Sequence, residues 1–185
     1  SLKRGGEKVS MSTRSGEFET LAEVIKDVGL DATRFFFLMR SSDTHLDFDL
    51  ELAKKESADN PVFYIQYAHA RICSIFRKAT ENGIKLLDSA DIDLSPLKNE
   101  EEFIMIKKIL SFGETIEKSA ELLEVHRIAF YLKDLVGTFH RYYSRNRIVS
   151  DDHALSSARL FLMNCLRITI RNGLSVMGVS APDRM

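Results

Sequence analysis

An aromatic and basic stripe lies in residues 61–71, which read PVFYIQYAHAR. At about 100° per residue, Tyr64, Tyr67 and Arg71 cluster on one side of a helix, away from its apolar positions. Two stacking rings and a guanidinium on one surface suit a protein that grips the unstacked bases of RNA. The alternative is a second packing face within a helical bundle, and the spacing alone leaves both interpretations open.

A polar loop, VSMSTRSG at residues 9–16, is the second segment that could do chemistry. It combines hydroxyls with the cation of Arg14, and Lys8 lies just before it. A loop of this kind can close over the phosphates of a nucleotide and stabilise the charge that develops during nucleotidyl transfer. The alternative is a linker rich in serine and threonine.

Helical periodicity dominates the chain after residue 20, and a short hairpin with Gly5-Gly6 at its turn precedes it. The sequence therefore predicts an all-α fold, a helical bundle preceded by a small β-hairpin and loop piece. The first expected helix starts at a capping box of Thr20 and Glu23 and stops at Gly29, and the second follows a cap at Asp31 over ATRFFFLMR. The third starts from a cap at Asp49 and ends near residue 58, and the fourth runs from Pro61, with Asn60 as its cap, to about residue 79. Further helices are expected over 100–111, 114–124, 126–143 and from 154 to a stop at Asn172-Gly173.

Three of these helices show a clear apolar stripe that should face the core. The predicted buried positions are Val62, Ile65, His69, Ile72 and Phe76 in the first, Leu132, Leu135, Val136 and Phe139 in the second, and Leu160, Met163, Leu166 and Ile170 in the last.

Composition limits the possible partners. The chain has 185 residues, 44% of them hydrophobic, which is enough for one core. With 26 lysines and arginines against 27 aspartates and glutamates, it is not a polybasic nucleic-acid tail. The last 60 residues, however, hold nine basic and four acidic side chains, and the basic ones are mostly arginines. Arginine suits phosphate contacts and base stacking, although a solvated helix surface would account for any single one of them.

Several classes of site are excluded or disfavoured. Cys73 and Cys165 are too few and too scattered for a disulfide framework or a zinc site. Asp47, Asp49 and Glu51 alternate as a cap and a solvated helix start would, so no metal is expected. Glycine-rich phosphate fingerprints, a secretory segment and a run of about 18 apolar residues are all absent from the sequence. We expect a cytoplasmic protein without a membrane partner or a tightly bound cofactor.

Three segments also resemble one known family. PVFYIQYAHARI resembles the start of the anticodon-binding helical domain of arginyl-tRNA synthetases, GEKVSMSTRSGEF resembles their signature loop, and the terminal APDRM resembles their C-terminus. The segments occur in the family's order over almost the whole chain. The resemblance implies a C-terminal fragment, with the end of a class I catalytic domain at residues 1–59 and an α-helical anticodon-binding domain at residues 60–185.

The resemblance implies a catalytic role for the polar loop. The class I pattern there is Lys-Met-Ser-Lys-Ser, and both pattern lysines are missing here, which leaves Lys8 and Arg14 as the cations for the phosphates. The partner motif His-x-Gly-His is also absent, so the fragment alone should be inactive. The implied catalytic residues are Ser10, Met11, Ser12, Thr13 and Arg14, and the implied ATP-binding residues are Lys8, Ser12 and Arg14.

The resemblance also implies anticodon-contacting residues in the helical part. These are Tyr64, Tyr67, Arg71, Tyr143 and Met185. Aromatic rings can stack on splayed bases, and a methionine side chain can cover one. Tyr143, in HRYYSRNR, could instead continue the apolar stripe of its helix.

The function implied for the full enzyme is that of an arginine–tRNA ligase. It would join arginine to ATP, releasing pyrophosphate, and then esterify its tRNA. The expected partners are arginine-specific tRNA, arginine and ATP, with magnesium bound mainly by the catalytic domain outside this chain, and a monomer is expected. A non-catalytic RNA-binding module and a helical protein-interaction domain are the alternatives from other classes. A further alternative, within the same class of enzymes, is a synthetase of another amino-acid specificity, such as a cysteinyl enzyme.

Overall fold

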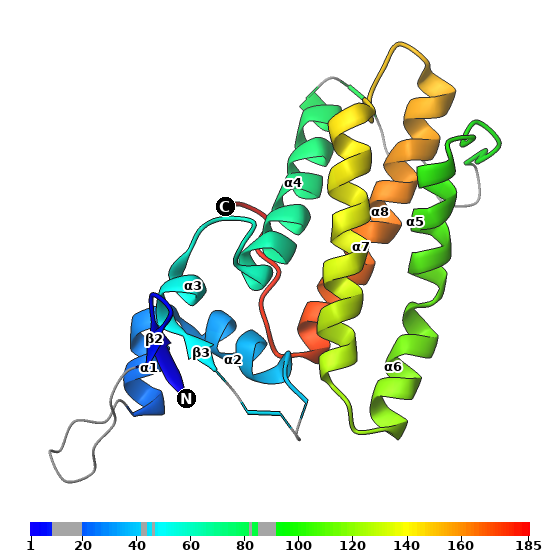
Figure 1. Ribbon diagram of the computed structural model, residues 1–185. Coiled ribbons are helices and arrows are strands. Elements are labelled where there is room, and N and C mark those ends of the chain that lie inside the picture. Colours follow the sequence, from blue (N-terminus) through cyan, green and yellow to red (C-terminus); the bar gives the residue numbers. More distant parts are fainter. Residues whose placement is uncertain (9–19, 42–43, 46, 82, 85–91) are drawn as a thin grey trace, which may run out of the picture.

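The computed structural model describes residues 1–8, 20–41, 44–45, 47–81, 83–84 and 92–185. Its N-terminal part is a small mixed unit. Strands β1 (Leu2–Arg4) and β2 (Glu7–Lys8) form the predicted hairpin, which turns at Gly5 and Gly6 with φ of 62° and 88°. A third strand, β3 (Phe48–Asp49), pairs with β1 in parallel and gives the sheet order β2-β1-β3. Helices α1 (Leu21–Val28), α2 (Leu30–Leu38) and α3 (Leu50–Lys54) pack around this sheet (Figure 1).

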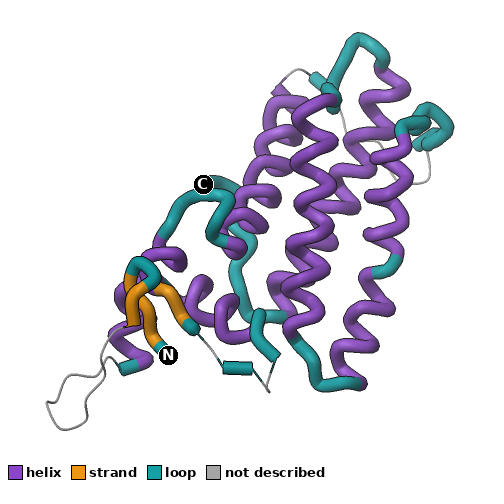
Figure 2. The backbone as a smooth tube through the Cα atoms, viewed as in Figure 1, coloured by secondary structure: helices purple, strands orange, loops and turns teal. Residues whose placement is uncertain are grey.

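The larger part is a helical bundle, as predicted. Helices α4 (Pro61–Glu81), α5 (Glu100–Leu110), α7 (His126–Arg145) and α8 (His153–Val176) lie side by side, and α6 (Phe112–Glu121) extends the line of α5 (Figures 1 and 2). From the end of α8 the chain turns back as an irregular tail beside α4, where the C-terminus lies. Among the described residues, no helix is long and apolar enough to cross a membrane.

The predicted apolar stripes form the bundle core. All thirteen predicted positions on α4, α7 and α8 are buried, and Ile65, Leu132 and Leu166 are completely so. His69 is buried with them although its ring is polar. Periodicity therefore located the inward face of each long helix correctly.

Two of the predicted helix caps are confirmed, and two others are wrong. Thr20 with Glu23 and Asp49 cap their helices as expected, although α3 ends at Lys54 rather than near residue 58. Asp31 does not cap α2, because the helix begins at Leu30, two residues before the predicted start, and the Asp31 carboxylate accepts tertiary hydrogen bonds instead. The Asn60 side chain donates to the carbonyls of residues 53 and 55 rather than capping α4.

The predicted stop at Gly173 is wrong. Helix α8 continues to Val176, and the chain leaves it at Gly178, where φ is 66°. A Cβ atom on Gly173 would lie 2.7 Å from a methyl carbon of the fully buried Leu132 on α7. Gly173 therefore lets two helices approach closely, so its role is tertiary and leaves no signal in local periodicity.

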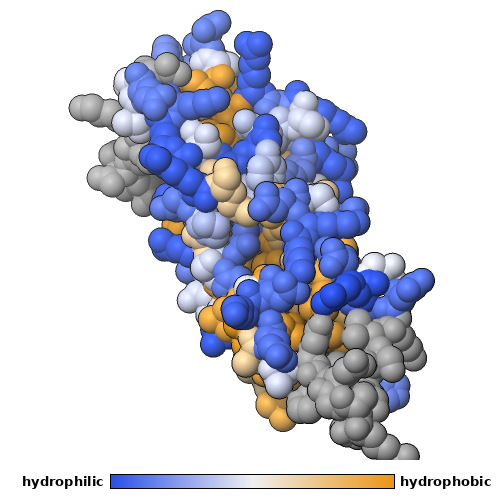
Figure 3. All heavy atoms as spheres, turned by 90° about the vertical axis from the view of Figure 1, so that its left-hand side faces the viewer, coloured by the Kyte–Doolittle hydropathy of each residue, from blue (hydrophilic) through white to orange (hydrophobic). Residues whose placement is uncertain are grey.

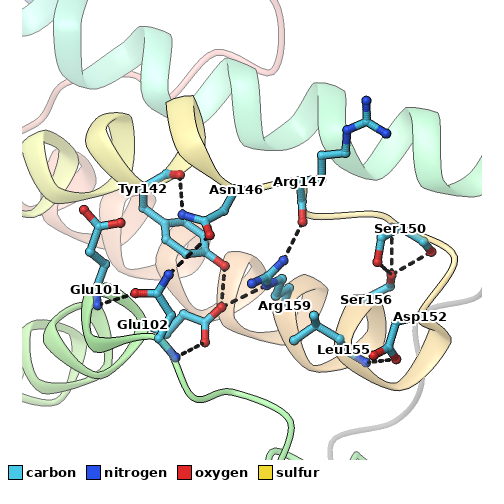
Figure 4. Close-up of polar contacts among 11 residues, drawn as sticks. Glu101, Glu102, Tyr142, Asn146, Arg147, Ser150, Asp152, Leu155, Ser156 and Arg159 are labelled. Atoms are coloured by element: carbon cyan, nitrogen blue, oxygen red, sulfur yellow. Dashed lines mark hydrogen bonds and ion pairs between the residues drawn. The ribbon is translucent and has the colours of Figure 1, made fainter.

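A buried ion pair joins α5, α7 and α8. Glu102 is completely buried, and its Oε1 accepts hydrogen bonds from Arg159 Nε at 2.9 Å and Tyr142 Oη at 2.6 Å (Figure 4). Its Oε2 accepts from the backbone N–H of Asn99 at 3.1 Å, which completes a capping box. The guanidinium also donates to the Arg147 carbonyl at 2.8 Å. Both charges are thus hydrogen-bonded on several sides, which is the condition under which a buried pair is tolerated.

Removing one partner of this pair should be severe. We expect Arg159→Leu to lower the free energy of unfolding by about 3–5 kcal/mol, because Glu102 is left charged and uncompensated in the core. Urea unfolding followed by circular dichroism measures this. Arg145→Ala, which breaks an exposed pair with Glu101 at 3.5 Å, should cost less than about 1 kcal/mol. Equal losses in the two variants would contradict the special position of Glu102.

The close approach at Gly173 gives a second test. Alanine favours a helix over glycine by about 1 kcal/mol, yet Gly173→Ala should destabilise the protein by about 1–3 kcal/mol, because the added methyl group would lie 2.7 Å from the fully buried Leu132, which would have to shift. In Gly113→Ala on α6 the added methyl group meets no atom within 4 Å, so this variant should be stabilised by up to about 1 kcal/mol. Thermal unfolding of both variants shows whether the signs are opposite, and a stabilised Gly173→Ala would refute the packing argument.

Candidate nucleic-acid interface

A pocket of about 500 Å³ lies where α4, the end of α7 and the C-terminal tail meet. Four of the five residues proposed for base contacts line it, namely Tyr67, Arg71, Tyr143 and Met185. They come from three separate parts of the chain, so the pocket exists only in the folded protein. The side of the molecule on which the C-terminus lies is covered mainly by hydrophilic residues (Figure 3).

Arg71 is held between two tyrosine rings. Its guanidinium carbon lies 5.5 Å from the centroid of Tyr67 and 4.7 Å from that of Tyr143, within the range of cation–π contacts. It also donates a hydrogen bond to the Tyr67 hydroxyl. Burial alone would lower the pKa of Arg71, but hydrogen bonding to Tyr143 and Tyr67 outweighs it and raises that pKa. The pocket thus presents a fixed cation whose N–H groups can only donate.

Tyr64 does not line this pocket. It lies on nearly the same side of α4 as Arg71 but two helical turns away, about 10 Å along the axis. Its ring packs at 4.5 Å from the ring of His140 and lies in a separate hollow with Gly137 and Arg141. Burial raises the pKa of the Tyr64 hydroxyl. The structure therefore places Tyr64 beside the pocket residues without joining them.

His140 neighbours these tyrosine rings but was not among the predicted site residues. Its ring lies between Tyr64 and Tyr67, 6.0 Å from the latter, and its Nε2 is buried without a hydrogen-bond partner among the described residues. Burial, with a smaller effect of the Arg71 charge, lowers its pKa. A neutral ring here avoids repulsion with Arg71. An aromatic side chain one turn before Tyr143 was the available signal.

The polar lining adds groups that suit a phosphate backbone. Ser74, Arg77, Lys78 and Arg184 line the pocket together with the rings. Ser74 and Lys78 lie three and seven residues after Arg71, so they share its side of the helix, and this periodicity could have identified them. Among the residues that the structure describes, no aspartate or glutamate side chain lines the pocket, so its side chains combine stacking surfaces with excess positive charge.

The first part of the tail is attached to two helices. The Asp31 carboxylate of α2 accepts hydrogen bonds from the N–H of Ser180, at 3.2 Å, and from its hydroxyl. Gln66 of α4 donates to Asp31 at 2.9 Å and to the Ser180 carbonyl at 3.0 Å. Arg34 donates to the Gly178 carbonyl at 2.7 Å. The tail thus starts from a defined position between the N-terminal part and the bundle.

The second part of the tail follows α4 toward the pocket. His69 Nδ1 lies 3.0 Å from the Pro182 carbonyl, Cys73 donates to Asp183 at 3.2 Å, and Arg77 donates to the Asp183 carbonyl at 3.0 Å. Successive turns of α4 thus contact successive residues of the tail, and the last contact lies beside the pocket. They explain how Arg184 and Met185 reach Tyr67 and Arg71.

His69, Cys73 and Asp183 also form a set that could hold a metal ion, since their ligand atoms lie within 4.8 Å of one another. No metal was expected from the sequence, because the two cysteines are few and scattered and the acidic residues near Asp49 suit a helix start. A carbonyl can only accept, so the contact to Pro182 indicates a proton on His69 Nδ1, the atom that faces the set. Burial, and then the hydrogen bond to Asp183, raise the pKa of the Cys73 thiol. In the described geometry, His69 and Cys73 therefore keep their protons and donate hydrogen bonds to the tail, and Asp183 accepts one of them.

The polar loop contributes no geometry. Ser10, Met11, Ser12, Thr13 and Arg14 lie outside the described residues. Lys8 ends β2, and its backbone pairs with Lys3. The proposed catalytic and ATP-binding roles of these residues remain predictions.

Comparison with known proteins gives a consistent family. Residues 65–185 match the family model described as the DALR anticodon binding domain. Arginine–tRNA ligases from Syntrophotalea carbinolica and Desulforamulus reducens are 52% and 51% identical over 184 residues, which is 100% of this chain and 33% of each of those proteins. The chain thus spans about a third of the length of these curated relatives.

Solved structures agree in fold. A Campylobacter jejuni protein described as an arginyl-tRNA synthetase superimposes with a TM-score of 0.86 at 33% identity, over 100% of this chain and 39% of that one. The arginyl-tRNA synthetase of Thermus thermophilus gives a TM-score of 0.75 at 26% identity, over 100% of this chain and 34% of that one.

Attachment of the tail can be tested through the reactivity of Cys73. The thiolate is the reactive form, and the thiol is buried beneath the tail with a raised pKa, so alkylation should be slow. In a Cys165→Ser background, Asp31→Ala should speed iodoacetamide modification of Cys73 about fivefold or more, because hydrogen bonds worth about 1 kcal/mol or more are lost.

The control is Asp27→Ala. This variant breaks an ion pair in which the Asp27 carboxylate lies 2.7 Å from Lys54 Nζ, and within the described part of the chain neither residue contacts the tail through a hydrogen bond. Its alkylation rate should match that of the parent protein. An unchanged rate in Asp31→Ala would show that this contact does not hold the tail.

Proposed function

Since the chain belongs to the DALR anticodon-binding domain family and its curated relatives are arginine–tRNA ligases, we propose that it is the tRNA-binding part of such a ligase. It binds the anticodon arm of arginine-specific tRNA and orients that tRNA for the catalytic domain. The observation that carries this proposal is the pocket formed by Tyr67, Arg71, Tyr143 and Met185.

The chemistry of the pocket supports recognition of an unstacked base. The tyrosine rings offer stacking surfaces, and Met185 supplies a polarizable side chain at the pocket edge. Arg71 can donate to acceptor atoms on a base edge, which carries sequence information. Lys78 and Arg184 are placed to meet phosphates, which carry affinity but little specificity.

In the full-length enzyme, arginine and ATP would first react to give arginyl-adenylate and pyrophosphate. The arginyl group would then pass to the terminal adenosine of the tRNA, releasing AMP. We propose that Ser10, Met11, Ser12, Thr13 and Arg14 form the loop that stabilises charge in the first step, with Lys8, Ser12 and Arg14 meeting the phosphates of ATP. Magnesium would accompany ATP in the catalytic domain.

The division at residues 59 and 60 belongs to the same proposal. The N-terminal unit would close the catalytic domain, and the bundle with its tail would carry the anticodon-binding surface. We also propose that the full-length enzyme is a monomer in the cytoplasm. The alternatives are a non-catalytic RNA-binding module and a helical interaction domain, and the latter predicts no dependence of RNA affinity on Tyr67 or Arg71.

Binding measurements separate these possibilities. The chain should prefer arginine-specific tRNA over the same tRNA with a changed anticodon across a salt series. Tyr67→Ala should raise the Kd for the cognate tRNA by about 5- to 150-fold, since one aromatic–base stack contributes about 1–3 kcal/mol, and should remove the preference. Fluorescence anisotropy with labelled tRNA measures both effects.

Tyr67→Phe keeps the ring and should retain most of the preference. Phe103→Ala removes an aromatic side chain of α5 that is 48% exposed and does not line the pocket, so this variant should bind normally. Equal, purely salt-dependent binding of the two tRNAs by the parent chain would argue against anticodon recognition.

A further inference from the structure

A second hollow of about 380 Å³ adjoins the pocket. Tyr143, Lys78 and Ile75 line both of them, so the two share one wall. The far side of the second hollow is formed by residues 146–149, which connect α7 to α8. No sequence motif pointed to this connection as part of a binding surface.

The floor of the second hollow is apolar. Ile75, Ala79 and Ile148 are each less than a tenth exposed, and Val149 is half-buried beside them. An apolar floor next to the aromatic ring of Tyr143 suits a nucleobase, because every base has a π-face that can stack on such a ring. The hollow therefore offers a place for a base without selecting one by hydrogen bonding.

The rim carries two exposed cations, Lys78 and Arg147. Neither has an ion-pair partner among the residues that the structure describes. Arg147 is held through its backbone, because its carbonyl accepts from Arg159, while its side chain points away from this network (Figure 4). A fixed backbone with an unpaired guanidinium is suited to a phosphate.

Hydrogen bonds to neighbouring elements hold the connection that carries Arg147. Asn146 donates to the Tyr142 carbonyl at 2.9 Å and accepts from Asn99 at 3.2 Å. Ser150 is bound to Ser156, at the start of α8, through its N–H at 2.9 Å. Hydrogen bonds to α7, to the N-cap of α5 and to α8 thus fix the connection that forms one wall of the hollow.

We propose that the second hollow binds the nucleotide next to the one held in the pocket, with its base on the apolar floor and its phosphate at Lys78 and Arg147. This inference depends on the proposed function, since it extends the same RNA strand by one step past Tyr143. Continuity of the two hollows and the charge of the rim support a single-stranded nucleotide as the occupant.

The base contact is tested with the anticodon stem-loop of arginine-specific tRNA, made abasic at one loop position at a time. The unaltered chain should lose about 5- to 150-fold in Kd at two neighbouring positions. Tyr67→Ala should abolish the sensitivity at one of them. Val149→Asp, which places a charge on the floor, should abolish it at the other, while Val176→Asp, at a position 58% exposed on α8, should change neither.

The phosphate contact is tested by salt dependence. Arg147→Ala should weaken binding and reduce the slope of log affinity against log salt by about 0.7, as expected for one lost phosphate contact on a single strand. Arg145→Ala removes the same charge two residues earlier, from a side chain that pairs with Glu101, and should change the slope less.

The outcomes separate this inference from the proposed function. Sensitivity at a single position, lost in Tyr67→Ala, with Arg147→Ala behaving like Arg145→Ala, would overturn the second hollow and leave anticodon binding intact. Insensitivity at every loop position in the unaltered chain would overturn both.

Discussion

The buried carboxylate of Glu102 constrains the rotation of three helices at once. It accepts hydrogen bonds from Tyr142 of α7 and Arg159 of α8 from within α5, and these contacts keep its charge compensated in the core. Because successive helical residues are about 100° apart, holding Tyr142 toward α5 and α8 turns Tyr143 toward α4. The cation–π contact between Tyr143 and Arg71 is therefore linked to an interaction on the adjoining side of α7.

The C-terminal tail extends this logic to the surface. A terminal segment without regular structure usually frays, because its backbone groups find better partners in water. Here side chains of α2 and α4 satisfy the backbone at Gly178, Ser180, Pro182 and Asp183. The tail thereby links the N-terminal unit to the bundle and becomes a wall of the pocket.

Sequence reasoning succeeded where the physical cause is local. Hydrophobic periodicity located the core faces of α4, α7 and α8, and hydrogen bonds within one turn placed the caps at Thr20 and Asp49. It failed where a residue with a familiar local role serves a distant partner. Gly173 accommodates Leu132 instead of ending a helix, and Asp31 binds the tail instead of capping α2.

Local sequence patterns predict the helical fold, the apolar stripes and the pair Tyr67 and Arg71, whose spacing of four residues places them on one side of any helix. The folded arrangement alone shows that Tyr143 and Met185 line one pocket with that pair, that Tyr64 does not, and that a second hollow adjoins them. The reason is physical. Helical geometry relates residues within a few turns, whereas contacts between distant segments depend on how whole faces pack and which buried charges must be compensated.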